Sequence, residues 1–367
     1  MSSTVRWQIQ FYGPGGDGAR EGLHPGDVLV TNHPSSGGSH LPDITVVTPV
    51  FRDDKIVFFV ASRGHHADVG GSTPGSMPPF SKHISEEGIA VKTFKLVNHG
   101  VYDEKGVNTL FKESRRIEDN VSDLNAQTAA NKRGIFLINE LIDEHGLRVV
   151  QTYMRYVQEN AELAVRDMLR ATGKRLVETR SLEDPENHSP TVTLRSADRM
   201  DDGSVVALEL TIDPASGTAH FDFTGTSCEV FGNWNAPTAV TSAAVIYVIR
   251  CLVNQEIPLN EGCLRPVTIT IPDGTFLSPS ENAAVVGGNV LTSQRVTDVC
   301  LYAFGACANA QGCMNNLTFG NDSFGYYETI GGGAGAGPSW NGASGTQVRV
   351  SGFCVSQIQT RGLPPRS

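Results

Sequence analysis

Histidine and aspartate side chains gather between residues 32 and 71, in two turns that also contain glycine. The candidate metal-binding residues in these turns are His33, His40, Asp43, His65, His66 and Asp68. Imidazole and carboxylate groups together suit divalent cations such as zinc, manganese, iron and nickel, and the absence of cysteine from both turns argues against a structural thiolate zinc site. The alternative is that these are loop residues that hydrogen-bond to the turns around them. We predict a catalytic divalent-metal site.

The two turns are separated by apolar segments that predict a β-hairpin. Residues 44–51 (ITVVTPVF) and 56–61 (IVFFVA) are short and rich in β-branched and aromatic side chains, with polar residues between them. The first turn precedes the first strand and the second turn follows the second strand, so an up-and-back hairpin brings both turns to the same end. Neighbouring side chains on a strand point to opposite faces, so we expect one of His65 and His66 at the metal and the other behind it or in the substrate pocket.

Composition and charge exclude several classes of protein. The chain of 367 residues has a net charge of −10, no apolar run of membrane-spanning length, and no signal peptide at its start. The acidic balance argues against nucleic acid and anionic membranes as partners, so we expect a cytoplasmic protein that binds a small molecule. Seven cysteines without a CxxC pair predict reduced thiols rather than a disulfide framework.

Beyond the turns, the sequence alternates between helical and strand patterns. Apolar residues repeat at helical spacing from residue 120 to 172 with a break at 145–146, and three strand-like segments lie between residues 191 and 226. A buried helix at 238–253 and a strand at 266–272 follow. We therefore expect an α+β fold with mixed β-sheets, a long antiparallel helical hairpin and buried helices. The expected parts are residues 1–187 with the metal site and hairpin, residues 188–346 with a β-meander, and a divergent tail at 347–367 outside the fold.

The motif VVGGNVLTSQR at residues 285–295 is the second functional candidate. A glycine pair precedes a predicted helix whose first turn carries Thr292, Ser293 and Arg295. A helix start is a natural anion site because its first backbone N–H groups are unpaired. Arg295 could bind a substrate carboxylate with both arms of its guanidinium group. The alternative is ordinary helix capping by Thr292 or Ser293.

A long loop rich in proline and glycine, residues 71–88, follows the second turn. A loop of that length beside a candidate site predicts a lid or a pocket wall. His83, Glu86 and Glu87 could reach a ligand or a metal from this loop, although they could equally be solvated loop charges.

Four motifs resemble the hydantoinase B/5-oxoprolinase family in the same order along the chain, and within that family the carboxyl-terminal half of ATP-dependent 5-oxoprolinases. They are GDVLVTNHPSSGGSHLPDITVVTPVF, FFVASRGHHADVGGSTPGSMPP, DNVSDLNAQTAANKRG and VVGGNVLTSQRVTD. The resemblance runs to about Gly345. It implies a hydantoinase B-like fold and an amidohydrolase part that opens 5-oxo-L-proline to L-glutamate in glutathione metabolism, coupled to ATP.

The resemblance also implies roles for individual residues. His40, Asp43 and His65 match the positions that hold a divalent metal in related carboxylases, whereas many family members have Asn-Asp-Pro where this chain has Asn32, His33 and Pro34. The other implied roles are an orienting group or general base at His66 or Asp68, a carboxylate-binding role for Arg295, and pocket positions at Asp123, Asn131 and Ser293. The implied cofactor is divalent Mn, Zn or Mg, and ATP would act only through a separate hydantoinase A-like half or subunit. We expect a homo-oligomer.

Other functions are compatible with the same motifs. A hydantoin-type hydrolase or a metal-dependent carboxylase subunit would use a similar site. The resemblance begins inside the family's domain and ends near residue 346, so we expect a fragment that lacks both ends. A truncated, inactive remnant or a partner-binding module is therefore the alternative from another class.

Overall fold

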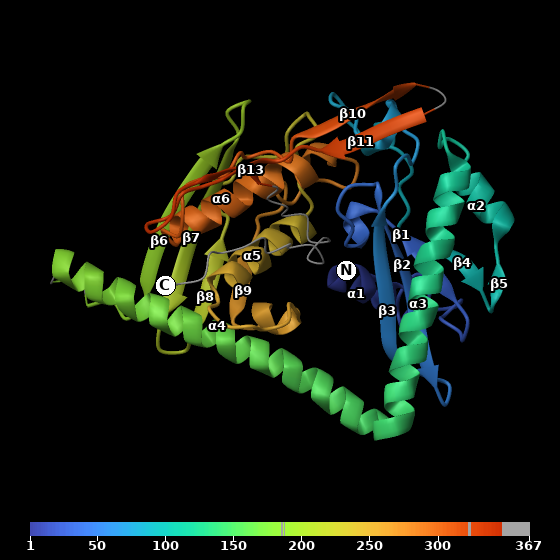
Figure 1. The fold of residues 1–367 in the computed structure, drawn as a ribbon, viewed down its shortest axis with the longest axis horizontal. Coiled ribbons are helices and arrows are strands. Elements are labelled where there is room, and N and C mark those ends of the chain that lie inside the picture. Colours follow the sequence, from blue (N-terminus) through green and yellow to red (C-terminus); the bar gives the residue numbers. More distant parts are fainter. Residues whose placement is uncertain (185, 187, 322–323, 347–367) are drawn as a thin grey trace.

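The strands of the chain form two main sheets, each with its own helices (Figure 1). The computed structural model describes residues 1–184, 186, 188–321 and 324–346. The predicted α+β class is confirmed by this mixture of helices and open sheets. The predicted tail at 347–367 and the boundary at residue 187 lie outside the described residues.

The first sheet contains the predicted hairpin. Its strand order is β3-β2-β1-β4-β5, and its members are β1 (Val28–Thr31), β2 (Asp43–Arg52), β3 (Lys55–His65), β4 (Phe94–Asn98) and β5 (Val101–Tyr102). The pair β2 and β3 is antiparallel, with Asp43 directly opposite His65. The predicted hairpin is therefore confirmed, and its register places the two polar turns at one end of the sheet.

Helices cover both faces of this sheet. Helix α1 (Ser2–Tyr12) contributes Tyr12 to a small cluster with Leu29 and Val47 on one face. On the other face, α3 (Ile117–His145) contributes Leu124 to a larger cluster that includes Val30. The connecting segments form short helices: η1 (Pro34–Ser36), η2 (Pro74–Ser76), η3 (Ile84–Glu86) and α2 (Glu104–Leu110). Strand β2 is thus enclosed between two layers, so polar groups at its end are removed from water.

Two long helices, α3 (Ile117–His145) and α4 (Leu147–Glu183), meet at Gly146, whose φ is 83°. They cover the segment where the periodicity predicts helices, although α4 continues past the expected end at residue 172. The two helices diverge from Gly146 instead of packing along each other (Figure 1). This differs from the expected antiparallel packing. Helix α3 packs on the β2–β3 hairpin, whereas α4 packs on the second sheet. Apolar side chains near the junction are consequently exposed, with Tyr153 at 66%. Among the described residues, no helix combines the length and apolar character that crossing a membrane requires.

The second sheet contains the predicted meander with one further strand. Its order is β6-β7-β8-β9, formed by β6 (Val192–Arg199), β7 (Val205–Asp213), β8 (Thr218–Asp222) and β9 (Val267–Thr270). Strands β6, β7 and β8 are antiparallel neighbours, and β9 pairs parallel to β8 after a crossover through α5 (Thr238–Leu252). Alternate residues of β7 are buried, so one face of the sheet is covered.

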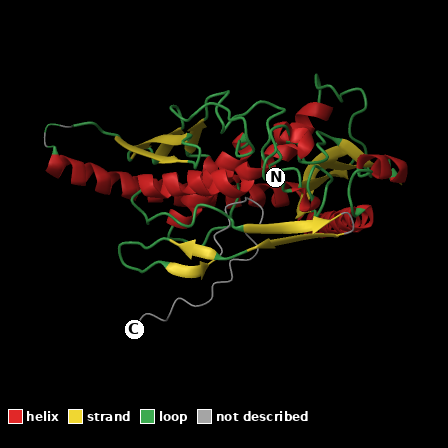
Figure 2. Cartoon of the chain, turned by 90° about the horizontal axis from the view of Figure 1, so that it is seen from above, coloured by secondary structure: helices red, strands yellow, loops and turns green. Residues whose placement is uncertain are grey.

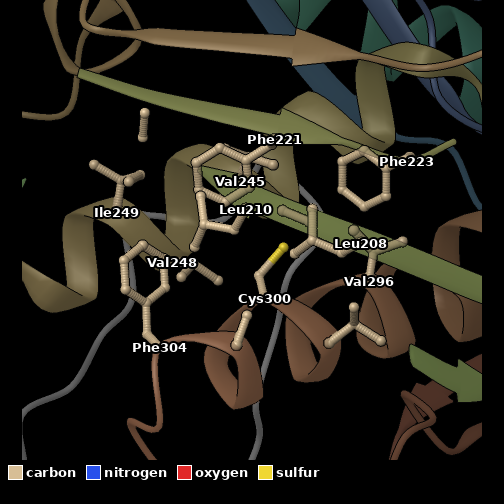
Figure 3. Packing of buried hydrophobic residues seen from close by; sticks show 14 of the residues in the cluster. Leu208, Leu210, Phe221, Phe223, Val245, Val248, Ile249, Val296, Cys300 and Phe304 are labelled. Carbon is tan, nitrogen blue, oxygen red and sulfur yellow. The ribbon is translucent and has the colours of Figure 1, made fainter. Parts of the chain in front are cut away.

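The main hydrophobic core lies on that covered face (Figure 3). Phe221 from β8 packs with Val245 from α5 and Cys300 from α6 (Ser293–Ala303). Helix α4 adds Leu169 to the same core. Helix α4 therefore packs with the second sheet although it precedes residue 187. The expected division of the chain at that residue stays a prediction.

The remaining strands reach back toward the first sheet. They are β10 (Asn316–Asn321), β11 (Phe324–Thr329), β12 (Gly332–Ala334) and β13 (Ala343–Thr346). The β10–β11 pair extends away from β12–β13 and lies over the first part of the chain (Figures 1 and 2). It packs against η2 so closely that a Cβ atom on Gly75 would lie 2.5 Å from Thr318 Cγ2. The loop that follows the second turn is thereby in contact with β10.

Candidate functional site

His40 and Asp43 form a hydrogen-bonded pair in the turn before β2. His40 Nδ1 donates to Asp43 Oδ2 at 3.0 Å, and Ser39 Oγ donates to the same oxygen at 2.6 Å. The side chain of His40 is buried, at 1% exposure, and its Nε2 atom has no hydrogen-bond partner within the described residues. When His40 is neutral, Nδ1 carries the proton that it donates in the hydrogen bond to Asp43. The lone pair of the ring is then on Nε2.

His65 and Arg63 are placed beside this pair by β3. The imidazole rings of His65 and His40 have centroids 5.1 Å apart. Arg63 precedes His65 by two residues and therefore shares its face of the strand. Its guanidinium group donates to Thr45 Oγ1 at 2.6 Å and to Ser39 Oγ at 3.3 Å. Sequence reasoning missed Arg63, because the strand predicted at 56–61 ends before it, whereas β3 continues to His65.

The surroundings of Asp43 keep it ionised. Burial alone would raise the pKa of this carboxyl group, but His40, His65 and Arg63 together hold it well below its usual range. Burial also lowers the pKa of Arg63 to about 10, which leaves it charged at neutral pH. The turn therefore contains a permanent carboxylate next to two imidazoles and a guanidinium group.

The donor groups fit a divalent cation, although they are not arranged as a complete cage. Within the described part of the chain, no group of three or more His, Cys, Asp and Glu side chains is arranged to hold a metal. His40 and Asp43 hydrogen-bond to each other. A carboxylate bound to one nitrogen of an imidazole is nevertheless the common way to orient the other nitrogen toward a metal. The unpartnered Nε2 atom of His40, with His65 beside it, is consistent with that arrangement.

His66 points away from His40 and is fully buried against α3. Asn120 Nδ2 donates to its Nδ1 at 3.0 Å, and its Nε2 donates to Gln127 Oε1 at 3.1 Å. Burial lowers the pKa of His66, which favours the neutral ring that these two bonds require. Both ring nitrogens are thus engaged in holding the end of β3 to α3.

Asp68 is also fully engaged. It accepts hydrogen bonds from the backbone of Gly70 at 2.9 Å and of Gly75 at 3.0 Å, and its carboxylate lies 3.1 Å from Arg115 Nη1. These contacts fold residues 66–76 into a tight loop. In this arrangement, Asp68 and His66 hold the second turn in place through buried hydrogen bonds.

The polar entry of α3 docks the helix onto the hairpin. Gln127 Nε2 donates to Ile44 O at 3.0 Å, and Asn131 Nδ2 donates to Val46 O at 3.1 Å. The buried positions of α3 repeat at helical spacing and include Asn120, Leu124, Gln127 and Asn131. Asp123, which the resemblance places in a pocket, is half-buried, and its charge acts on His66.

The second candidate motif forms a helix that begins earlier than the sequence predicts. Helical structure starts at Val286, passes through a π-helical segment (Gly288–Thr292), and continues as α6. Ser293 is buried in its interior and donates to Asn289 O at 2.7 Å. Arg295 forms an ion pair with Asp198 of β6 at 2.9 Å. The structure thus places Ser293 and Arg295 after the helix start, where their partners come from the same helix and from the second sheet.

The amino terminus of this helix is occupied by Glu87. The carboxylate accepts hydrogen bonds from the backbone N–H groups of Val285 at 3.0 Å and Val286 at 3.1 Å, and from Ser81 Oγ at 2.8 Å. Glu87 is fully buried, and burial raises its pKa to about 7 against the opposing effects of these bonds and of His40. The anion site predicted at the start of the helix is therefore filled by a side chain of the chain itself.

The loop predicted to be a lid or a pocket wall joins the two parts of the chain. Ile84 N donates to Asn282 O at 3.0 Å, and Asn233 Nδ2 donates to Pro78 O at 2.8 Å. We call residues 76–88 and 282–288, which meet here, the seam. His83 is exposed and Glu86 is half-buried, and together they form a capping box around η3.

Sequence reasoning could have distinguished Glu87 from His83 and Glu86, which are less buried. In a 3₁₀ turn, residues three apart lie above one another, and Glu87 is three residues after the apolar Ile84. Both are buried in the structure.

The pH dependence of stability tests the burial of Glu87. A carboxyl group whose folded-state pKa is about 7, instead of the ordinary 4.5, binds its proton more tightly when folded. Its contribution is therefore fully present below about pH 4.5 and is lost as the pH rises to about 7. Glu87→Gln, which remains neutral, should become more stable relative to the unchanged protein over this range, by at most about 3 kcal/mol. Urea unfolding at pH 5 and pH 8 measures this, and an equal difference at both pH values would contradict it.

The chain can now be compared with known proteins. Residues 1–358 match the family described as Hydantoinase B/oxoprolinase. The chain is 64% identical over 364 residues to 5-oxoprolinase 1 of Arabidopsis thaliana, which covers 96% of this chain and 28% of that protein. It is 53% identical over 359 residues to 5-oxoprolinase of Dictyostelium discoideum, covering 98% of this chain and 27% of the relative. The chain thus spans somewhat more than a quarter of the length of these relatives.

Solved structures agree on the fold. The ATP-dependent caprolactamase from Pseudomonas jessenii superposes with a TM-score of 0.78 at 22% identity, over 95% of this chain and 59% of that one. A nucleotide-free acetone carboxylase gives a TM-score of 0.79 at 16% identity, over 96% of this chain and 48% of that one. The family inferred from the four motifs is confirmed by the match along nearly the whole sequence. This chain belongs to the hydantoinase B/oxoprolinase family.

Proposed function

We propose that this chain is the hydrolase part of a 5-oxoprolinase, which opens 5-oxo-L-proline to L-glutamate with ATP bound on another part of the enzyme. The observation that carries the proposal is the buried His40, whose Nε2 atom is unpartnered among the described residues while Asp43 holds Nδ1 and His65 lies beside it. The identity of 64% to a 5-oxoprolinase supports the choice of substrate.

The reaction explains why ATP is needed. A lactam carbonyl is a poor electrophile, and transfer of a phosphoryl group from ATP to the ring oxygen would activate it. Water then adds to the ring carbon, and the C–N bond of the adduct breaks to leave an acyl phosphate, while the nitrogen takes up a proton to become the amine of glutamate. A second water hydrolyses the acyl phosphate, which releases phosphate and gives the side-chain carboxylate of glutamate.

The residues of this chain would act by holding groups in place. His40 and His65 would bind a divalent cation, with Asp43 as a further ligand or as the group that orients His40. Such a cation would polarise a carbonyl oxygen or lower the pKa of bound water. In this proposal, His66 and Asp68 hold the turn that presents His65, and each already has its polar atoms engaged.

The substrate carboxylate needs a cationic partner. Arg295 would have to exchange its ion pair with Asp198 for the substrate, and 27% of its side chain is exposed. Asp123 is half-buried near His66 and remains a proposed pocket residue, whereas Asn131 and Ser293 would support the pocket through their buried hydrogen bonds. The ATP-binding part and self-association are proposed partners of the chain.

Metal affinity tests the central element. We expect the purified chain to bind Mn²⁺ or Zn²⁺ in titration calorimetry, and the double variant His40→Ala, His65→Ala to bind at least tenfold more weakly. His83→Ala is the matched control, because that histidine is exposed and bonds only within its own turn. Equal affinity in the double variant and the unchanged chain would remove the proposed metal site.

Substrate turnover tests the reaction itself. The chain should release L-glutamate from 5-oxo-L-proline and ATP when it is combined with the ATP-binding part of a 5-oxoprolinase, and the double variant should not. Release of product from a hydantoin, or uptake of bicarbonate, with no glutamate formed would replace the proposed substrate.

A further inference from the structure

The two parts of the chain meet at the seam, where the buried carboxyl group of Glu87 bonds from one part to the other. Glu87 belongs to the loop that follows the second turn, and its backbone hydrogen-bond donors, Val285 and Val286, belong to the helix start almost two hundred residues later. Glu281 also crosses between the two parts, to Ser35, but it is exposed there. A buried carboxylate is costly unless hydrogen bonds stabilise it, and two of the donors that stabilise Glu87 come from the other part of the chain.

We propose that Glu87 is a positioning residue, which fixes the helix that starts at Val286 relative to the turn of His40 and Asp43. The proposal deepens the proposed function and rests on it, since the site whose geometry Glu87 sets is the candidate metal site.

On one side, the segment that carries Glu87 is tied to both polar turns. Asn32 Nδ2 donates to Leu41 O and to Ile89 O, both at 2.7 Å, which links the residue after His40 to the residue two after Glu87. The second turn is packed equally tightly, because a Cβ atom on Gly71 would lie 2.8 Å from the carbonyl carbon of Glu87. A shift of Glu87 would therefore move the supports of both turns.

On the other side, the carboxyl group of Glu87 accepts hydrogen bonds at a helix amino terminus. Val285 and Val286 are the N–H donors there, and a negative charge at that end is favoured by the helix dipole. The backbone of the next two residues is also held in place, because Gly287 N and Gly288 N donate to Asn233 O at 2.8 and 3.2 Å. The position that Glu87 gives to this backbone is thus transmitted into the π-helical segment and α6.

Hydrogen–deuterium exchange of the full-length chain tests the proposal, with Glu87→Ala, Glu87→Gln and Glu281→Ala compared with the unchanged protein. Glutamine keeps the carbonyl oxygen that can accept the bonds to Val285 and Val286, whereas alanine removes it. We expect peptides covering residues 283–290 to exchange at least tenfold faster in Glu87→Ala, and within about threefold of the unchanged rate in Glu87→Gln and Glu281→Ala.

Mn²⁺ affinity then separates positioning of the site from mere attachment of the helix. We expect Glu87→Ala, folded by circular dichroism, to bind Mn²⁺ several-fold more weakly than the unchanged chain, and Glu87→Gln to restore binding. Unchanged exchange in Glu87→Ala, or faster exchange with unchanged Mn²⁺ affinity, would overturn the proposal. If the unchanged chain bound no Mn²⁺, the proposed metal function would fail, and the exchange rates alone would decide whether Glu87 holds the helix.

Discussion

Replacing Asp68 with asparagine is expected to destabilise the folded chain by about 3–5 kcal/mol, because it breaks a buried ion pair on one side only. Asp68 is almost fully buried and lies 3.1 Å from Arg115 Nη1. Its two carboxylate oxygens accept from Gly70, Gly75 and Arg115, so each of them faces N–H donors. An amide at this position must turn its NH₂ group toward a donor, and it leaves the guanidinium charge unpaired.

Urea unfolding followed by circular dichroism measures this loss. The matched control is Asp119→Asn, which removes an ion pair of similar length, 3.2 Å, between two side chains that are about half exposed. Exposed pairs contribute little, so the control should lose less than about 1 kcal/mol. The double variant Asp68→Asn, Arg115→Met should recover part of the stability, because no charge is then left without a partner. A loss of under about 1 kcal/mol in Asp68→Asn would show that the loop of residues 66–76 does not depend on this pair.

Local patterns predicted the hairpin but not the partners of its polar residues. The apolar segments at 44–51 and 56–61 and the polar residues between them specify two neighbouring strands, and the register then follows from the tight turn. The same reasoning grouped His40, Asp43 and His65 at one end of the hairpin. It could not assign His66, because both of its partners come from α3, more than fifty residues away.

Amphipathic periodicity shows that a helix has a buried side but does not say what covers it. The stripes of α3 and α4 predicted that the helices pack on each other, whereas Gln127 and Asn131 fasten α3 to the hairpin and Leu169 of α4 packs in the second core. Gln127 and Asn131 identify the surface that α3 covers better than its apolar residues do, because each donates to a backbone carbonyl group of β2.

The role of Glu87 depends on a contact between residues 198 positions apart, which no local pattern reveals. The sequence motif around Gly287 predicted a bound anion at a helix start. In the structure, the backbone donors at that start bond to the side chain of Glu87, and the helix begins a few residues before the predicted start. Arg295, predicted to meet a substrate, likewise has a distant partner in Asp198.

Replacing Gly288 with alanine is expected to destabilise the chain by about 3 kcal/mol or more, because a new methyl group would enter closely packed backbone. A Cβ atom on Gly288 would lie 2.1 Å from Asn235 O and 2.9 Å from Ala236 Cα. These are main-chain atoms, which cannot rotate away as a flexible side chain would. Relief requires the start of the π-helical segment to move away from residues 235–236, and this same backbone is held by Glu87 through Val285 and Val286.

Gly64→Ala is the matched control, because its added Cβ atom would meet nothing closer than the Gln127 side chain at 3.4 Å, an ordinary van der Waals contact. We expect it to change the free energy of unfolding by less than about 1 kcal/mol, measured by urea unfolding beside Gly288→Ala. If Gly288→Ala folds at low temperature, its peptides at residues 283–290 should exchange faster than those of the control, because the backbone there must shift away from Glu87. Normal stability together with unchanged exchange would mean that the helix start tolerates displacement, and the close fit at Gly288 would then have no part in locating the site.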